Sequence, residues 1–344
     1  MSMARSGAPP PAVAIVTTLK VPEDDRGTSV VLSWCRWHLG IGFAHLFLFF
    51  DEAGPQGDPR GAEESEPAVL HEAANKSPPG DSADEPPPST PRPEHPAAAA
   101  VEAAADLPAG SVTLVCGRHP QVQAWQRTHC PSRDSAGPFA ATQVPARQVL
   151  NAEMALALSR GRVTWLLHLD IDELFFTGPP DSKPSQAPQA KAPASRHGEP
   201  PSPGSGSIDA KSGATPGIAP GAGVSGAESW LARAALLPSA AAHFAALDSE
   251  GVGHMTYLNH EAAPETSEVH DYFEECTLFR RHHFSVPMTR EARDAMRWWE
   301  RRTGHGQYLL VYDCGKSATR VLPGVECASP HAFKTPKRRA GAGA

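Results

Sequence analysis

The sequence predicts an α/β fold in which a doubly wound, mainly parallel β-sheet carries helices on both faces. Short apolar runs rich in β-branched residues alternate with longer segments of helical periodicity, which is the pattern of such folds. The chain opens with a strand–helix–strand pattern, the repeating unit of this architecture. A later run, residues 163–169 (VTWLLHL), is largely apolar, as expected of a strand that is covered on both faces.

The expected elements follow one another along the chain with two long gaps, at residues 53–110 and 177–228. Residues 12–19 (AVAIVTTL) predict the first strand because β-branched side chains dominate them. A helix follows, capped by Thr28 or Ser29 and ending near Leu39. Further strands are expected at 45–50, 111–116, 163–169, 253–258 and 308–312, helices at 146–160, 230–247 and 290–302, and a loop at 313–320.

Two tracts differ from the rest of the chain in composition. Residues 53–110 and 177–228 are rich in Pro, Gly, Ala and Ser and hold almost no large apolar side chains. Such segments bury too little surface to offset chain entropy, so they are expected to be disordered insertions. What remains of residues 12–333 has the size of one domain, roughly 220–240 residues. Residues 334–344 are expected to form a basic, flexible tail.

Charge and hydropathy restrict the partners. The formal charge is -7, and acidic and basic residues are interspersed, which disfavours a nucleic-acid partner. No segment approaches the ~20 apolar residues of a membrane span, and residues 1–11 lack the apolar stretch of a signal peptide. The six cysteines show neither a CxxC pair nor zinc-site spacing. These observations predict no membrane span in this chain and leave its compartment open.

The segment WLLHLDIDELFF (165–176) gathers three carboxylates directly behind the largely apolar strand. On an extended strand, positions two apart point to the same side, so Asp170 and Asp172 are expected to reach one ion together. Crowded carboxylates repel each other unless a cation compensates them, and hard divalent cations prefer oxygen ligands. The sequence therefore predicts a divalent metal site here, at the carboxyl end of a parallel strand where open α/β sheets bind ligands.

Two acidic segments offer a general base. LNHEAAPE (258–265) follows an expected strand and places Glu261 beside His260, although the same residues could simply form a turn. DYFEECTLFRR (271–281) offers Asp271 at a helix start, where acids also serve the helix dipole alone.

Two cations and one histidine follow near the end of the chain. YDCGKSATR (312–320) is not a Walker sequence, but Lys316 and Arg320 could meet a diphosphate, or else lie in a solvated loop. His331 is either a lone surface histidine or a further metal ligand.

Together these stretches resemble glycosyltransferase family 92 and related family-2-like glycosyltransferases. The resemblance lies in LSWCRWHLGIGFAHLFLFFDE, RQVLNAEMALALSRGRVTWLLHLDIDELFF, TYLNHEAAPE, DYFEECTLFRR and YDCGKSATRV…PHAF, in that order. It implies a GT-A fold, a nucleotide-sugar donor of the UDP-sugar type, and a divalent ion, usually Mn²⁺ or else Mg²⁺, held by the Asp-x-Asp element. The implied activity is sugar transfer of the hexosyltransferase type to a glycan or another hydroxyl acceptor.

The resemblance also implies roles for individual residues. Asp170 and Asp172 would hold the metal, with His331 as a further metal or phosphate contact. Lys316 and Arg320 would neutralise the leaving diphosphate. Glu261, ahead of Asp271, would remove the acceptor proton. The nucleoside pocket would be lined by Thr17, Thr18 and Asp51.

The resemblance bears on location too, and two other functions stay open beside it. Golgi or secretory-pathway membrane proteins are common among such enzymes, but with no anchor visible a cytoplasmic location remains open. One alternative is a magnesium-dependent phosphohydrolase that uses Asp170 as nucleophile and Asp172 as acid. It is disfavoured because Leu174 stands where such enzymes usually carry Thr or Val, and because several elements precede the motif. The other is a catalytically inactive relative that only binds sugar.

Overall fold

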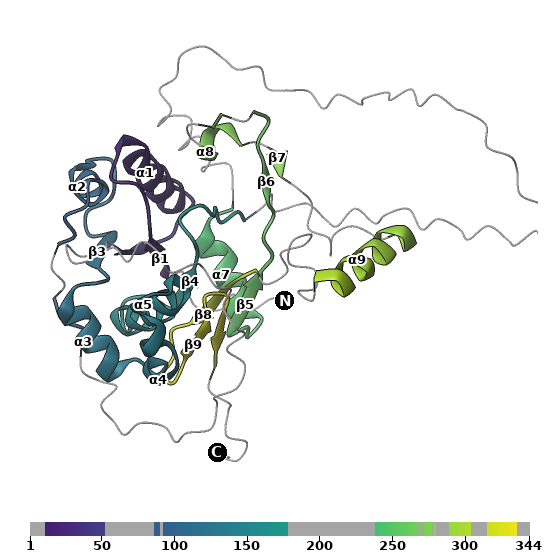
Figure 1. Cartoon of the computed structure of the whole chain (residues 1–344). Helices are drawn as coiled ribbons and strands as arrows, with labels where there is room; N and C mark the ends of the chain where they lie inside the picture. Colours follow the sequence, from purple (N-terminus) through teal and green to yellow (C-terminus); the bar gives the residue numbers. More distant parts are fainter. Residues whose placement is uncertain are drawn as a thin grey trace, which may run out of the picture.

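A computed structural model of the chain describes residues 11–51, 86–89, 92–177, 238–266, 268–269, 272–276, 278–279, 289–303 and 315–335. Its centre is a six-stranded sheet with the strand order β3-β2-β1-β4-β8-β5 (Figure 1). The strands are β1 (Val13–Leu19), β2 (His45–Phe50), β3 (Val112–Cys116), β4 (Trp165–His168), β5 (His254–Tyr257) and β8 (Lys316–Arg320). β1 to β4 pair in parallel, whereas β8 runs antiparallel to both β4 and β5. The prediction of an α/β fold with a mainly parallel sheet is confirmed.

Helices cover both faces of this sheet. The described helices are α1 (Asp25–Gly40), α2 (Pro96–Ala103), α3 (Pro120–His129), α4 (Arg133–Ala136), α5 (Val144–Ser159), α7 (Ala240–Ser249), α8 (Tyr272–Glu275), α9 (Arg290–Thr303) and a 3-10 turn, Gly137–Phe139. Of these, α9 lies apart from the sheet (Figure 1). There are also two small antiparallel pairs of strands: β6 (Ala262–Ala263) with β7 (Leu278–Phe279), and the hairpin of β9 (Glu326–Ser329) with β10 (Ala332–Lys334). None of the described helices combines the length and the apolar character needed to cross a bilayer.

The two faces carry separate apolar cores. Val13 and Ile15 of β1 point into one core together with side chains of α1, α2 and α7. Ala14 and Val16 point into the other, which α3, α5 and the β9–β10 hairpin complete. All seven residues of β1 are buried, which is why this strand lacks the polar alternation of a half-exposed strand. Figure 1 shows α1 and α2 on one side of the sheet and α3 to α5 on the other.

α1 begins earlier than the sequence suggested. Its N-cap is Asp24, whose carboxylate accepts a hydrogen bond from the backbone of Gly27 at 2.8 Å, so the expected caps Thr28 and Ser29 lie inside the helix. Gly27 is needed there because a Cβ at this position would lie 1.9 Å from the carbonyl oxygen of Pro22. Asp is among the preferred capping residues, and the expected cap lies about one turn too late in the chain.

The first insertion is shorter than predicted. Helix α2 lies within residues 53–110, and its Ala97, Ala98 and Val101 are buried in the core that α1 also lines. The prediction that the whole tract lies outside the domain is therefore wrong for this part. Composition was misleading because small alanine side chains allow two helices to pack closely, although each contributes little apolar area. Residues 53–85, 90 and 91 of this tract, and 178–228 of the second one, lie outside the described residues.

The predicted loop at 313–320 is also wrong where the structure describes it. Lys316–Arg320 is strand β8, hydrogen-bonded to β4 on one side and β5 on the other. Ser317 and Thr319 are buried although they are polar, because the strand lies inside the sheet. The predicted strand at 308–312 lies outside the described residues.

Candidate functional site

Polar side chains gather where the parallel strands end. The first half of α5 crosses this edge of the sheet, and three of its side chains each reach the end of a different strand. Arg147 donates to the carboxylate of Asp51 after β2 at 2.6 Å, and Gln148 donates to Asp170 after β4 at 2.8 Å. Asn151 donates to the hydroxyl of Thr18 in β1 at 3.0 Å. Because one helix bridges three strand ends, these groups form a single site.

The three carboxylates lie on a tight turn, residues 170–173, which we call the acidic turn. The backbone N–H of Glu173 donates to the carbonyl of Asp170 at 3.1 Å, and the backbone N–H of Asp170 donates to the Glu173 carboxylate at 3.0 Å. The expectation that Asp170 and Asp172 share one side of an extended strand is therefore wrong. β4 ends at His168, and the chain turns immediately after it.

A buried lysine compensates part of this charge. Lys316, the first residue of β8, pairs with one oxygen of Asp170, and its Nζ lies 3.6 Å from an oxygen of Glu173. Its side chain is 2% exposed. Burial alone would raise the pKa of Asp170. The charge and hydrogen bond of Lys316, together with the neighbouring His168 and His331, outweigh it, so the pKa of Asp170 lies below its ordinary value. Asp170 is therefore ionised and bound to an enclosed ammonium group.

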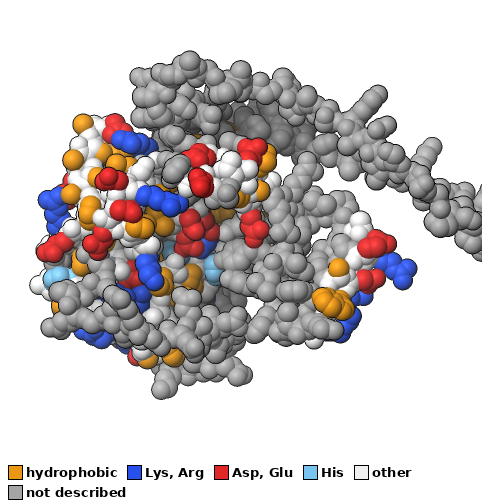
Figure 2. Space-filling view, turned by 45° about the horizontal axis from the view of Figure 1, so that its top comes forward, with side chains coloured by type: hydrophobic (Ala, Val, Ile, Leu, Met, Phe, Trp, Pro, Cys, Tyr) orange, Lys and Arg blue, Asp and Glu red, His pale blue; other side chains and the backbone are white. Residues whose placement is uncertain are grey.

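The other two carboxylates are less well compensated. Burial and the nearby charge of Asp170 raise the pKa of Asp172. Burial is also the largest cause of the raised pKa of Glu173, which Lys316 only partly offsets. Glu173 accepts a hydrogen bond from the side-chain amide of Asn259 at 2.5 Å, which brings the LNHE segment to the acidic turn. One ammonium faces three carboxylates, so negative charge remains. Figure 2 shows acidic side chains gathered near the middle of the described surface.

Three side chains of α1 fix the backbone of this region. The indole N–H of Trp34 donates to the carbonyl of Glu173, and that of Trp37 to the carbonyl of Phe175, each at 2.9 Å. The backbone N–H of Phe175 donates to Nε2 of His38 at 3.1 Å. Nδ1 of His38 therefore carries the proton and donates to the carbonyl of Trp34 at 2.8 Å. Burial lowers the pKa of His38 to about 3, so it remains the neutral acceptor that Phe175 requires.

Two histidines flank the pair of Lys316 and Asp170. Nδ1 of His331 lies 3.0 Å from the carbonyl of Gly315, and burial followed by the charge of Lys316 lowers its pKa. His168 is fully enclosed at the end of β4, with Nδ1 2.6 Å from the carbonyl of Pro330. The Nε2 atom of His168 has no hydrogen-bond partner among the described residues. The sequence suggested His331 for this site but not His168.

A positively charged group lies at the same edge of the sheet as the acidic turn. Asp51 is 2% exposed, and its two oxygens accept from Arg118 at 3.0 Å and from Arg147 at 2.6 Å. Two guanidinium groups around one carboxylate leave a net positive charge beside β2 and β3. Asp51, a predicted nucleoside contact, is thus bound by two arginines. Thr17, another predicted nucleoside contact, is fully buried, and its hydroxyl has no hydrogen-bond partner among the described residues. The sequence assigned no role to Arg118, nor to Arg147, which opens the stretch RQVLN.

Two predicted site residues lie apart along one strand. Arg320 pairs in register with Trp165 at the start of β4, and its Nε is 3.5 Å from a carboxylate oxygen of Asp248. Arg320 is four residues beyond Lys316, which is about 13 Å along β8. Arg320 and Lys316 therefore lie at opposite ends of β8. The expectation that both cations meet over the acidic turn assumed a loop that could fold back, where the structure has a strand.

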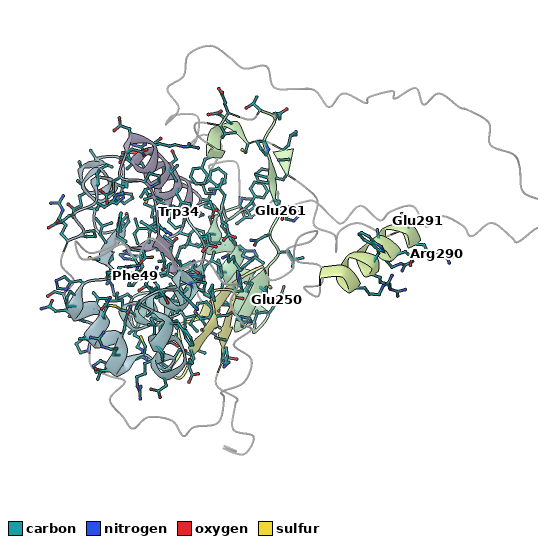
Figure 3. The ribbon with its side chains drawn as sticks, viewed as in Figure 1. Trp34, Phe49, Glu250, Glu261, Arg290 and Glu291 are labelled. Carbon is teal, nitrogen blue, oxygen red and sulfur yellow. The ribbon has the colours of Figure 1, made fainter. Side chains whose placement is uncertain are left out.

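The predicted general bases are placed differently. Glu261 is exposed on the segment that joins β5 to β6, as Figure 3 shows. It follows Asn259 by two residues, a span of about 7 Å of extended chain, and Asn259 contacts the acidic turn. Asp271 lies outside the described residues.

The residues of the acidic turn fit a divalent ion only in part. Both oxygens of Asp170 already accept, one from Lys316 and one from Gln148. Among the described residues, Asp172 accepts only from its own backbone. No group of three His, Cys, Asp or Glu in the described ranges is arranged to hold an ion by itself. Ions that arrive with phosphate need only one or two protein carboxylates, and Asp172 meets that requirement.

Comparisons with known proteins add no relative. No family model matches the chain, and neither a curated protein nor a solved structure matches it.

Proposed function

We propose that this chain is a glycosyltransferase that moves a sugar from a nucleotide-sugar donor, of the UDP-sugar class, to a hydroxyl of a glycan or another acceptor. One observation carries the proposal: the buried ammonium of Lys316 is held by Asp170 in an acidic turn at the carboxyl end of β4. Open α/β sheets bind ligands at these strand ends. A glycan acceptor would place the reaction in the Golgi or secretory pathway, as the sequence resemblance implies.

The chemistry of sugar transfer matches the charges at this edge. When the glycosidic bond of the donor breaks, negative charge grows on the departing diphosphate, and fixed cations stabilise it. Lys316 supplies one such cation in a position that burial and hydrogen bonding fix before the donor arrives. A divalent cation bound through Asp172 would supply Lewis-acid stabilisation of the same diphosphate.

The remaining groups have natural tasks around the donor. Arg118, whose side chain is 30% exposed, carries part of the positive charge beside the ends of β2 and β3 and can meet an anionic group of the donor. Glu261 lies exposed two residues beyond Asn259, where an acceptor can approach the site from solvent. In an inverting reaction it would take the proton of the acceptor hydroxyl.

The contacts disfavour the hydrolase alternative. A nucleophilic carboxylate needs an oxygen that is open to the phosphorus atom, whereas both oxygens of Asp170 accept hydrogen bonds. A role as partner of Lys316 explains both contacts. No described contact favours a phosphohydrolase over a sugar transferase.

Release of nucleoside diphosphate tests the proposal. The purified chain is incubated with UDP-glucose, UDP-galactose, UDP-N-acetylglucosamine and GDP-mannose, with and without Mn²⁺, and UDP or GDP is quantified. We expect release from at least one donor, reduced on the order of 10²- to 10³-fold in Lys316→Met. Arg320→Met is the matched control, since it removes a cation from the other end of β8, and it should keep the rate within about threefold.

Two outcomes would contradict the proposal. Release of inorganic phosphate from sugar phosphates without release from any nucleotide sugar would indicate the hydrolase. Binding of nucleotide sugars without any turnover would indicate an inactive relative. Circular dichroism of both variants shows whether any lost activity reflects lost folding.

A further inference from the structure

The two aspartates of the Asp-x-Asp element have different surroundings. Asp170 is bound on both oxygens, by Lys316 and by Gln148. Asp172 has no donor from another described residue. A pair of equivalent metal ligands would instead leave both carboxylates open toward one point. The element therefore divides into one carboxylate whose oxygens are both occupied and one that remains available.

Lys316 depends on Asp170 for its place in the structure. An ammonium that is 2% exposed needs a compensating charge within hydrogen-bonding distance, and Asp170 provides it. Glu173 lies farther away, with its oxygen 3.6 Å from Nζ, and its own oxygens accept from Asn259 and from the backbone of Asp170. Asp170 is thus the principal anchor of the lysine.

The ammonium keeps capacity for a ligand. It has three N–H donors, and Asp170 takes one of them. Because β8 runs antiparallel to β4, Lys316 enters the sheet beside the end of β4, where the parallel strands open toward the edge that α5 crosses. A phosphate oxygen at this edge could accept from the lysine without displacing Asp170.

From these contacts we propose that Asp170 is a positioning residue rather than a metal ligand. It holds Lys316 as a built-in cation for the diphosphate of the donor, while Asp172 is the carboxylate that meets the metal–nucleotide complex. This inference rests on the proposed function, and it assigns to the two aspartates separate tasks that the motif alone does not distinguish.

A double-mutant cycle tests the coupling of Asp170 with Lys316. The dissociation constant of UDP, and of GDP as a second nucleotide, is measured by calorimetry with Mn²⁺ present for wild type, Asp170→Asn, Lys316→Met and the double variant. The matched control replaces Asp170→Asn by Asp172→Asn in the same four-way comparison. Both asparagine variants remove one negative charge from the same turn, so general electrostatic effects are alike.

The expected pattern separates the two roles. Asp170→Asn and Lys316→Met should each weaken nucleotide binding by roughly 10- to 150-fold, the range for a hydrogen bond to a charged group. Adding Asp170→Asn to Lys316→Met should then change nucleotide affinity by no more than about twofold, because the lysine that Asp170 positions is already gone. Asp172→Asn should keep its full penalty in both backgrounds. Mn²⁺ binding in the presence of UDP, followed by electron paramagnetic resonance, should be lost in Asp172→Asn and retained in Asp170→Asn.

The opposite pattern would overturn the inference while leaving the proposed function standing. If Asp170→Asn weakens nucleotide binding as much in the Lys316→Met background as in wild type, or abolishes Mn²⁺ binding in the presence of UDP, Asp170 is itself a ligand of the metal or the nucleotide. If the wild type binds neither nucleotide with Mn²⁺, the proposed function fails, and the inference fails with it.

Folding is controlled within the same set of variants. Asp170→Asn alone leaves a buried charge without its main partner, whereas the double variant replaces the pair by neutral side chains of similar size. We expect the double variant to melt at a higher temperature than Asp170→Asn. A lower melting temperature for the double variant would contradict the dependence of Lys316 on Asp170. Should Asp170→Asn not fold, Lys316→Met and the double variant still give the comparison that decides the inference.

Discussion

Replacing Trp34 by Phe should loosen the acidic turn, because the indole N–H of Trp34 is the donor that α1 supplies to the carbonyl of Glu173. Trp34 is fully buried, and its ring packs 4.2 Å from that of His38 between centroids. The substitution keeps an aromatic ring in the core but removes the hydrogen bond. Its effect therefore reports how strongly α1 holds the turn.

The magnitude follows from a comparison within the same chain. Trp125 is 8% exposed, and its indole N–H has no partner among the described residues, so Trp125→Phe loses ring area without losing a hydrogen bond. Subtracting the two variants leaves the cost of a buried carbonyl deprived of its donor, about 1–3 kcal/mol. With a urea m-value of ~2 kcal/mol/M, this separates the two unfolding midpoints by roughly 0.5–1.5 M.

Urea unfolding followed by circular dichroism measures this difference, and m must stay constant for the comparison to hold. Affinity for UDP with Mn²⁺ provides a second reading, which should fall in Trp34→Phe and stay near the wild-type value in Trp125→Phe. Equal destabilisation by the two substitutions, or an unchanged affinity in Trp34→Phe, would refute the reasoning that α1 positions the acidic turn.

Three further predictions concern other parts of the domain. Burial raises the pKa of Glu153 to about 7 from 4.5 despite hydrogen bonds from Ser132 and Cys327. The folded state thus favours the protonated form of Glu153, so the free energy of unfolding should fall by about 3 kcal/mol as pH rises from 4.5 through 7. In urea titrations at several pH values, Glu153→Gln should remove this dependence of stability on pH. Gly315→Ala should lower the free energy of unfolding by about 2 kcal/mol or more, because φ is +62° and the new Cβ would lie 2.2 Å from the carbonyl oxygen of Tyr257. Thermal melting measures this loss. An unchanged melting temperature would contradict the close approach of these two backbone segments. Burial raises the pKa of the Cys130 and Cys327 thiols, so iodoacetamide should label them only after unfolding, as mass spectrometry can show.

The sequence was sufficient for elements whose own pattern determines them. β1, β2 and β4 are buried strands and appear as apolar runs, and α5 shows helical periodicity over residues 146–160, close to its observed bounds. β5 lies within the predicted strand at 253–258. α9 lies at the predicted amphipathic helix 290–302, apart from the sheet in Figure 1. In each case the local spacing of apolar and polar side chains is enough to predict the element.

The missed elements depend on partners that are distant in the chain. β8 is a strand because β4 and β5 supply hydrogen bonds on both sides, while its own sequence, KSATR, is polar. α2 is stable because its alanines meet α1 closely, not because they form a large apolar face. Local pattern cannot show either effect.

The candidate site likewise contains residues that the local sequence reveals and contacts that it does not. Asp170 and Asp172 stand out in sequence because three acids follow a largely apolar strand. The contact between Lys316 and Asp170 joins residues 146 positions apart, and the contact between Trp34 and Glu173 joins residues 139 positions apart. Sequence reasoning named Lys316 but paired it with Arg320, which strand geometry places at the other end of β8.

A crystal structure of the protein with UDP and Mn²⁺, analysed for the anomalous signal of manganese, would show directly which aspartate binds the ion. We expect one manganese peak within coordination distance of the Asp172 carboxylate. We also expect a diphosphate oxygen within hydrogen-bonding distance of Nζ of Lys316, with the pair of Lys316 and Asp170 retained. A manganese peak bound to Asp170 with Lys316 displaced would contradict the separate tasks of the two aspartates. UDP bound away from the carboxyl ends of β1 and β4 would contradict the proposed donor site itself.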